Sequence, residues 1–155
     1  MPLRFKIRSA HRPISAAIDF FSSLLDANII LRHTLADHTD HSPKATAFFI
    51  RVARGEVRVR TTDTVIFEAA FTMERTYRVP RAEIRDQLLA ILALPGVILP
   101  GKRRYRRVFE LYVGYPRLSF ADSSHISVME RAGMTEIVTF DQGFDNIPDI
   151  TRIEP

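Results

Sequence analysis

The chain has 155 residues, of which 46% are hydrophobic and 26% are charged, as is typical of a globular protein with one domain. It contains no cysteine, which excludes a disulfide framework and a thiolate metal site. No apolar run approaches the ~18 residues of a membrane-spanning helix, so a membrane span is excluded. The net charge is +4 at pH 7 and the pI is about 9.8, a basic excess that favours anionic partners.

The amino-terminal segment differs in composition from the rest of the chain. Residues 1–18 hold four basic residues and no acidic residue, and they lack the apolar core of a secretory signal. We expect a poorly ordered extension over residues 1–19 and a single domain over residues 20–155.

The domain begins with an apolar stretch, FFSSLL, which predicts a buried strand over residues 20–25. A short helix is expected next, over residues 27–35. A polar loop follows and ends at Ser42 and Pro43, which we interpret as the N-cap and the first position of a second helix. The segment EVRVRT then alternates with a period of two and predicts a second strand over residues 57–61.

Helices and strands continue to alternate in the rest of the chain. Helices are expected over residues 62–77, 81–93, 101–114 and 119–133, and short strands are expected within residues 94–100, 136–140 and 150–153. The sequence contains no tight hairpin signal and no internal repeat. This alternation predicts an α/β fold with a mainly parallel sheet.

Two aspartates follow predicted strands directly. Asp26 ends the first strand, and Asp141 follows the fourth strand in EIVTFDQGF. In a parallel α/β sheet, ligands bind outside the carboxyl ends of the strands, where these two carboxylates are expected. Each aspartate also has a structural interpretation, because an aspartate after a strand often caps the next helix or forms an Asx turn. The residues alone leave both interpretations open.

Two further acids lie on predicted helices. Glu68 lies among apolar neighbours in VIFEAAF, without a basic residue three or four positions away to form a helical salt bridge. We therefore expect Glu68 to be buried or to face a pocket. Asp122 and Ser119 have the S-x-x-D spacing of a capping box, which satisfies free amides in the first turn of a helix. That role is compatible with function, because this turn faces the carboxyl edge of the predicted sheet.

The predicted fold brings Asp26, Glu68, Asp122 and Asp141 to the same edge of the sheet. Closely packed carboxylates repel each other by about 1 to 4 kcal/mol per pair, depending on solvent screening. A bound divalent cation removes this repulsion, and Mg²⁺ and Mn²⁺ prefer carboxylate and water oxygens. Asn28 could orient Asp26 or metal-bound water through a hydrogen bond.

Four motifs, in this order along the chain, resemble those of the PIN-domain ribonucleases, particularly the VapC-like toxins of bacterial and archaeal toxin–antitoxin pairs. The motifs are LLDANIILR with Asp26 and Asn28, VIFEAAFTMERTYRVPRAEI with Glu68, LSFADSSHISVMERAG with Asp122, and IVTFDQGF with Thr139 and Asp141. The resemblance covers roughly residues 20–155. It departs from the family pattern in the additional leading segment and in Ala27, where threonine is also common.

The resemblance implies a three-layer α/β/α fold with a mainly parallel five-stranded sheet, and a metal-dependent endoribonuclease. In such an enzyme a water activated by Mg²⁺ or Mn²⁺ attacks an RNA phosphodiester in line. The resemblance assigns catalysis and metal binding to Asp26, Glu68, Asp122 and Asp141, with Asn28 and Thr139 in supporting positions. It also implies an RNA substrate, a cognate antitoxin protein, a homodimer and a cytoplasmic location without membrane contact.

Other features of the sequence have two interpretations. A non-catalytic PIN-like module that binds RNA or a protein partner is the main functional alternative. The stretch KRRYRR at residues 102–107 could contact RNA phosphates or form the solvated face of a helix. His33, His38 and His41 flank a loop that also contains two aspartates, and this loop could be an ordinary polar loop or a zinc site.

Overall fold

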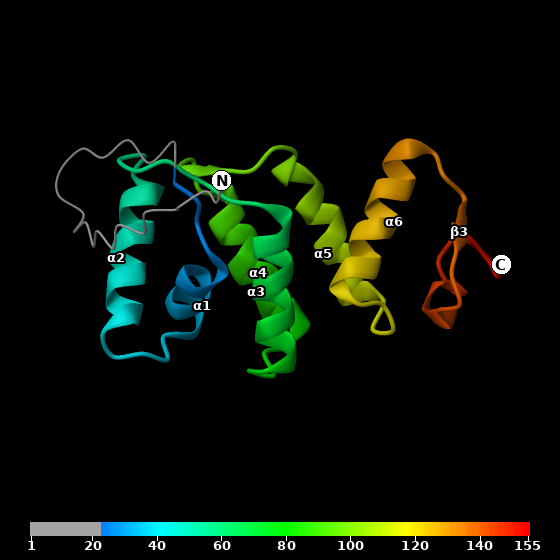
Figure 1. Ribbon diagram of the computed structural model, residues 1–155, viewed down its shortest axis with the longest axis horizontal. Helices are drawn as coiled ribbons and strands as arrows, with labels where there is room; N and C mark the ends of the chain where they lie inside the picture. Colours follow the sequence, from blue (N-terminus) through cyan, green and yellow to red (C-terminus); the bar gives the residue numbers. More distant parts are fainter. Residues whose placement is uncertain (1–22) are drawn as a thin grey trace, which may run out of the picture.

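The computed structural model describes residues 23–155 (Figure 1). Its elements are, in chain order, α1 (Ala27–Leu35), α2 (His41–Ala53), β1 (Val59–Arg60), α3 (Asp63–Arg75), α4 (Arg81–Ala93), β2 (Val97–Ile98), η2 (Lys102–Arg104), α5 (Tyr105–Gly114), α6 (Phe120–Ala132), β3 (Glu136–Val138), η3 (Gln142–Phe144) and β4 (Thr151–Ile153), where η marks a 3₁₀ helix. The α/β class predicted from the sequence is confirmed. The expected extension over residues 1–19 lies outside the described residues. Among the described helices, none has both the length and the apolar character needed to cross a membrane.

Capping residues define the ends of α3 and α6, as the sequence predicts. The hydroxyl of Thr62 accepts a hydrogen bond from the amide of Val65 at 3.4 Å and so caps α3. Ser119 and Asp122 form the predicted capping box at the start of α6. This helix ends at Gly133, whose φ of 66° lies in the left-handed region that glycine adopts without strain. The bounds of α1 and α4 also agree with the prediction.

The start of α2 differs from the prediction. The helix begins at His41 rather than at Pro43, and its N-cap is Asp40, which makes no side-chain capping bond. Ser42, the predicted N-cap, lies inside the helix, and its hydroxyl accepts a hydrogen bond from the amide of His38 at 3.1 Å. Nδ1 of His38 in turn accepts hydrogen bonds from the amides of Asp40 and His41 at 3.2 and 3.1 Å. Because these side chains satisfy the free amides, the helix starts earlier than its proline indicates.

The described strands pair in parallel, but they form two separate sheets. β1 pairs with β2, and in this pair Val59 lies opposite Val97. Leu24 forms an isolated parallel bridge with Arg60. β3 and β4 pair with each other in the second sheet. Within residues 23–155 of one copy, no ladder joins the strand at Leu24 to β3. The expected five-stranded sheet is therefore not formed by one copy of this part of the chain.

The helices separate the two sheets along the long axis of the molecule. In Figure 1, α1 and α2 lie at one end, α3 and α4 lie near the middle, and β3 lies at the other end, beyond α6. Two clusters of buried side chains match this arrangement. The larger cluster contains residues from all of the first five helices and the start of α6. The smaller cluster joins α5 and α6 to the second sheet through Leu111, Leu118, Ile126, Phe144 and Ile147.

Phe120 anchors the start of α6 in the larger cluster. The centroid of its ring lies 5.1 Å from that of Phe67 and 5.0 Å from that of Phe109. The ring of Tyr112 meets it edge to face at 5.3 Å. Aromatic pairs at these separations stabilise the fold beyond the burial of their surface. The first turn of α6, with Asp122, is thereby held beside α3 and α5.

Arg81 at the start of α4 holds the corner between α5 and α6. Its Nη1 donates to the carbonyl oxygens of Tyr112 and Leu118 at 2.9 and 2.8 Å. Its Nε donates to Glu74 at 2.8 Å, and the guanidinium lies 4.3 Å from the centroid of the Tyr112 ring. Because hydrogen bonds from a charged donor are stronger than neutral ones, this side chain connects α3, α4 and the turn before α6 firmly.

We expect Arg81→Ala to lower the free energy of unfolding by about 2–3 kcal/mol, because the corner carbonyls and Glu74 lose a charged donor. Urea denaturation measures this change as a lower midpoint with an unchanged slope. Arg85→Ala on the same helix is the matched control, since Arg85 pairs with the exposed Asp86. We expect the control to change stability by less than about 0.5 kcal/mol, and equal effects of the two substitutions would contradict the role of Arg81.

Candidate functional site

Asp26 occupies the N-cap position of α1 in extended backbone, with φ −89° and ψ 156°. The strand before it is held in place by the amide of Leu25, which donates to the carbonyl of Arg60 at 2.7 Å. The side chain of Asp26 is exposed and makes no capping bond to the helix. The capping interpretation is therefore excluded, and the carboxylate is available to an external partner.

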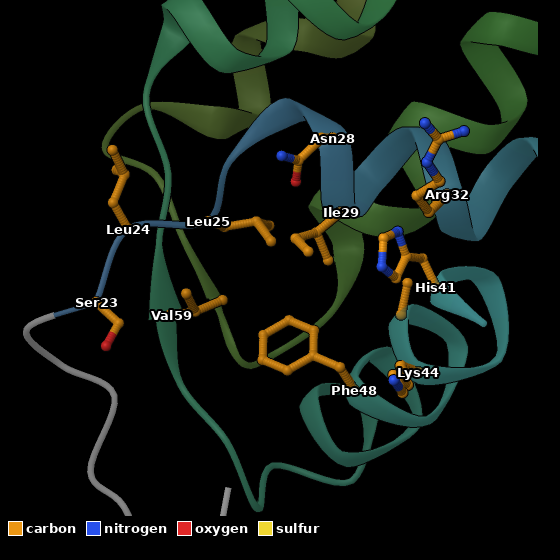
Figure 2. Close-up of a pocket in the computed structure, with 11 residues that line it drawn as sticks. Ser23, Leu24, Leu25, Asn28, Ile29, Arg32, His41, Lys44, Phe48 and Val59 are labelled. Carbon is orange, nitrogen blue, oxygen red and sulfur yellow. The ribbon is translucent and has the colours of Figure 1, made fainter. Parts of the chain in front are cut away.

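Asn28 lines a cavity of about 630 Å³ that lies beside α1, α2 and β1 (Figure 2). Arg32 and Lys44 add cationic groups to its lining. Its apolar lining residues are Leu24, Leu25, Ile29, Ala45, Phe48 and Val59. Arg32 and Lys44 are not among the site residues predicted from the sequence. The separation of Asn28 and Arg32 by four positions is the signal that could have shown that both lie on one face of α1.

Glu68 lies on α3 and faces a pocket, but it is not buried. Its side chain is exposed and, with Ser119, Phe120 and Ala121, lines a cavity of about 450 Å³ between α3 and the start of α6. Of the two expected alternatives, buried or pocket-facing, the structure shows the pocket-facing one. Of the apolar neighbours seen in the sequence, Ile66, Ala69 and Ala70 belong to the face of the helix that packs into the core. Phe67 and Phe71 instead line the same cavity as Glu68.

Asp122 is partly buried in the first turn of α6, where Ser119 holds it. Its Oδ2 accepts hydrogen bonds from the amide of Ser119 at 2.9 Å and from the hydroxyl of Ser119 at 2.6 Å. The amide of Asp122 donates back to that hydroxyl at 3.1 Å. Among residues 23–155, no group donates to the other oxygen, Oδ1. The capping box therefore fixes the carboxylate and leaves one oxygen for another partner.

Thr139 and Asp141 form a short hydrogen-bonded turn after β3. The hydroxyl of Thr139 accepts the amide of Asp141 at 3.1 Å, and Oδ1 of Asp141 accepts the amide of Gly143 at 2.7 Å. A Cβ atom at Gly143 would lie 3.0 Å from that same Oδ1, so this tight turn favours glycine. The structural interpretation of Asp141 is thus confirmed, since it caps η3. Its side chain remains exposed.

The four acids do not converge in one copy of the chain. The turn with Asp122 borders the cavity that Glu68 lines, so these two acids belong to one region between α3 and α6. Asp26 precedes α1, whereas Asp141 follows β3, beyond α6 (Figure 1). Among residues 23–155, no three histidine, aspartate or glutamate side chains form a group that could hold a metal ion. One copy of residues 23–155 does not gather the four acids, because the expected sheet edge is divided between two sheets, and their assignment to a metal site stays a prediction.

The motif acids differ from other acids of the chain in their electrostatic partners. None of the four motif acids forms an ion pair with a basic side chain of residues 23–155. In contrast, Asp37, Glu74 and Glu130 each pair with an arginine at 2.7 or 2.8 Å. A carboxylate without an internal cation keeps its full capacity to bind an external one.

The basic stretch KRRYRR is largely engaged in contacts within the chain. Lys102 donates to two backbone carbonyls at 2.8 and 3.2 Å, and burial lowers the pKa of its ammonium group. Arg104 and Arg107 form ion pairs with carboxylates of α3 and α6. Arg103 and Arg106 are exposed and form no ion pair within the described part of the chain. These contacts favour the structural interpretation of the stretch over an RNA-binding one.

The loop between α1 and α2 is also held by its own side chains. His38 and His41 stack with their ring centroids 4.0 Å apart. Asp37 accepts two hydrogen bonds of 2.7 Å from Arg32, and this guanidinium lowers the pKa of the Asp37 carboxyl group. No zinc-binding group forms at this loop in residues 23–155, and its contacts are those of a polar loop.

Similarity to known proteins agrees with the acidic motifs. The model of the PIN domain family matches residues 23–150. The chain is 30% identical over 131 residues to the VapC ribonuclease Mb1869c of Mycobacterium bovis and to the ribonuclease VapC13 of Mycobacterium tuberculosis. Each match covers 84% of this chain and 98% of the relative. The resemblance drawn from the motifs is thereby confirmed, and the chain belongs to the PIN-domain family, among the VapC-like ribonucleases.

Proposed function

We propose that this chain hydrolyses phosphodiester bonds in RNA and is the toxin of a toxin–antitoxin pair. The observation that carries the proposal is that a PIN-domain chain keeps all four motif acids, in order, within the matched span. The relatives named VapC ribonuclease match over 98% of their length, so the similarity extends to a whole ribonuclease rather than to a fragment.

The proposed ligands of a divalent cation, Mg²⁺ or Mn²⁺, are Asp26, Glu68, Asp122 and Asp141, with Asn28 and Thr139 as positioning residues. When bound, such a cation supplies an activated water and stabilises charge on the phosphate. The residues of one copy do not fit this ion, because Asp26 and Asp141 follow strands of different sheets. A complete site requires the edges of the two sheets to meet.

The hydrogen bonds within the motifs of Asp122 and Asp141 support a positioning role for Ser119 and Thr139. Ser119 holds Asp122 through two bonds, and Thr139 holds the backbone of Asp141. A carboxylate that is fixed in this way loses little conformational freedom when it contacts a cation or a substrate. The fixed acids are therefore ready for binding before any partner arrives.

A non-catalytic PIN-like module that binds RNA or a protein is the second candidate function. It is favoured by the absence of a metal-holding group among residues 23–155 of one copy. Incubation with a mixed RNA panel, in Mg²⁺, in Mn²⁺ and in EDTA, separates the two functions. Cleavage that depends on the cation and leaves 5′-phosphates supports the ribonuclease, whereas RNA binding without cleavage in either metal supports the module.

The proposed partners are an antitoxin and a second copy of the chain, acting in the cytoplasm. The unpaired motif acids support the choice of antitoxin chemistry, because exposed carboxylates attract arginine or lysine side chains. An antitoxin segment with such residues would compete with the cation for the same oxygens.

We expect Asp26→Asn and Asp141→Asn each to reduce RNA cleavage about a hundredfold or more, equivalent to roughly 2.7 kcal/mol in the activation barrier. Each substitution removes one ligand charge while it keeps the shape of the side chain. Initial rates on a labelled RNA measure the effect, and circular dichroism checks the fold. Asp86→Asn, an exposed aspartate on α4, is the control and should cleave normally. Wild-type rates for both motif variants would refute the metal assignment.

Glu68→Gln should reduce cleavage by about tenfold or more with little loss of stability, because Glu68 is exposed and lines a cavity rather than the core. Cleavage assays and urea denaturation of the same preparation measure both quantities. Glu83→Gln on α4, which is also exposed, is the matched control. A variant that is strongly destabilised but keeps its activity per folded molecule would show that Glu68 is structural.

Binding of the antitoxin and of Mg²⁺ should be antagonistic, because both use the motif carboxylates. Titration calorimetry of the chain with the antitoxin encoded beside it, with and without magnesium, measures this coupling. Asp26→Ala should weaken both interactions. Equal antitoxin affinity in the two buffers would instead indicate inhibition at a remote surface.

A further inference from the structure

Within the described part of the chain, the strand at residues 23–25 has one open edge. On its paired edge, the amide of Leu25 donates to the carbonyl of Arg60 at 2.7 Å, and the carbonyl of Ser23 accepts the amide of Arg60 at 3.1 Å. Strand geometry directs the peptide groups of Leu24 toward the opposite edge, where no strand of residues 23–155 pairs with them. The side chain of Leu24 is 61% exposed, which is unusual for a leucine in a predicted core strand.

β3 has a matching open edge. Its paired edge faces β4. The carbonyl of Thr135 accepts a hydrogen bond from the amide of Thr151 at 2.7 Å, and the amide of Thr139 donates to the carbonyl of Ile153 at 2.9 Å. By the same alternation, the peptide groups of Val138 point away from β4, and no described strand lies there. The side chain of Val138 is 67% exposed, and that of Phe140, two positions later, is 71% exposed. An apolar strand with an unpaired edge is a template for pairing with another strand.

The two open edges are complementary in direction and in chemistry. Both belong to parallel sheets, and each strand is followed by a motif acid, Asp26 in one case and Asp141 in the other. If β3 pairs in parallel with residues 23–25, the combined sheet has five strands in the order β2, β1, 23–25, β3 and β4. The carboxyl ends of parallel strands share one edge of a sheet, so this pairing brings the two aspartates together.

The β3 strand of a second copy can pair with residues 23–25 more easily than the β3 strand of the same chain can. Figure 1 places α1 and β3 at opposite ends of the molecule, with α3 to α6 between them. The second sheet is held there by the cluster that includes Leu118, Phe144 and Ile147. Pairing within one chain would separate these buried side chains, which lose their contacts when the sheet moves. Pairing between two copies leaves the cluster intact.

We propose that two copies of the chain exchange strand pairs, so that β3 of each copy pairs with residues 23–25 of the other. The arrangement is reciprocal and closes on a two-fold axis. Each composite site contains Asp26 of one copy and Asp141 of the partner copy. The assignment of these acids to catalysis rests on the proposed ribonuclease function, whereas the pairing itself rests on the open edges.

The cavity of Figure 2 offers a place for the exposed side chains of the exchanged strand. It has a volume of about 630 Å³ and lies beside the open edge, with Leu24, Ile29 and Phe48 among its lining residues. Val138 and Phe140 occupy the same face of β3, because residues two positions apart point in the same direction. In the dimer these side chains cover the apolar part of the cavity and remove it from water.

Disulfide cross-linking of the full chain tests the pairing directly, because the natural sequence contains no cysteine. One chain carries Leu24→Cys, a second chain of different tag length carries Ile137→Cys, and the two are co-expressed. In a parallel ladder, Leu24, whose peptide groups face β3, lies opposite a residue of β3 whose peptide groups face β4, and the two side chains are on the same face of the sheet. Neighbouring strands lie about 4.8 Å apart, within the range that a disulfide spans. Thr139→Cys, two positions further along the same face, covers the alternative register. Val128→Cys on α6, 51% exposed, is the matched control.

We expect oxidation to link the Leu24→Cys chain to the Ile137→Cys or Thr139→Cys chain as a covalent dimer, but not to the Val128→Cys chain. A double variant that forms its disulfide only within one chain would overturn the proposal in favour of a closed monomer. Failure of both β3 positions to react would also overturn it, by showing that a different segment or a different protein occupies the edge. Equal linking of the control would show that the contacts are random.

Complementation tests the composite site with other variants. In co-expressed Asp26→Asn and Asp141→Asn chains, half of the dimers are mixed, and each mixed dimer has one site with both aspartates. We expect about a quarter of the wild-type cleavage rate, although each variant alone is inactive. Sites built within one chain would give no recovery and would overturn the exchange. If the cross-link forms but the wild-type chain cleaves no RNA, the proposed function fails and the exchange stands.

Discussion

The corner held by Arg81 determines where the last part of the chain lies. Its guanidinium binds the carbonyls of Tyr112 and Leu118, so the turn between α5 and α6 has one position relative to α4. Phe120 follows directly and inserts its ring between those of α3 and α5. The direction of α6 is then set, and the chain leaves this helix on the side away from α1 (Figure 1). The position of the second sheet follows from this corner.

This arrangement keeps Asp26 and Asp141 apart in one copy and so avoids their mutual repulsion. In the exchanged dimer, Asp26 and Asp141 approach each other, and their repulsion of about 1 to 4 kcal/mol opposes the pairing of strands. A divalent cation that binds only the paired state shifts the equilibrium toward that state. Strand exchange and cation binding would therefore stabilise each other, and a complete site would depend on the concentration of the chain.

The contacts of the charged residues separate structural groups from candidate functional ones. Arg81, Arg104 and Arg107 each pair with a carboxylate of another helix and hold the helices together. The motif acids have neutral partners at most, such as the hydroxyl of Ser119 at Asp122. The basic excess of the sequence is therefore partly used inside the fold, and net charge alone does not locate an RNA-binding surface.

The sequence by itself determined the local features of this protein, because each depends on a few neighbouring residues. Thr62 and the Ser119–Asp122 pair mark helix starts through bonds within one turn, and the family motifs follow from the order of the acids. The exposure of Glu68 was less predictable, since some of its apolar neighbours belong to the core face of the helix and others line the same open cavity. At the start of α2, the side chain of His38 replaced the predicted cap.

Only the tertiary structure decided how the strands pair and which acids meet. Residue 24 and residue 138 are separated by more than a hundred positions, and a short parallel strand carries no local signal for its neighbour. The same hydrophobic pattern is compatible with pairing inside one chain or between two chains. Which of these occurs depends on the packing of Phe120, Arg81 and the cluster around Phe144, because these contacts set the distance between the two open edges.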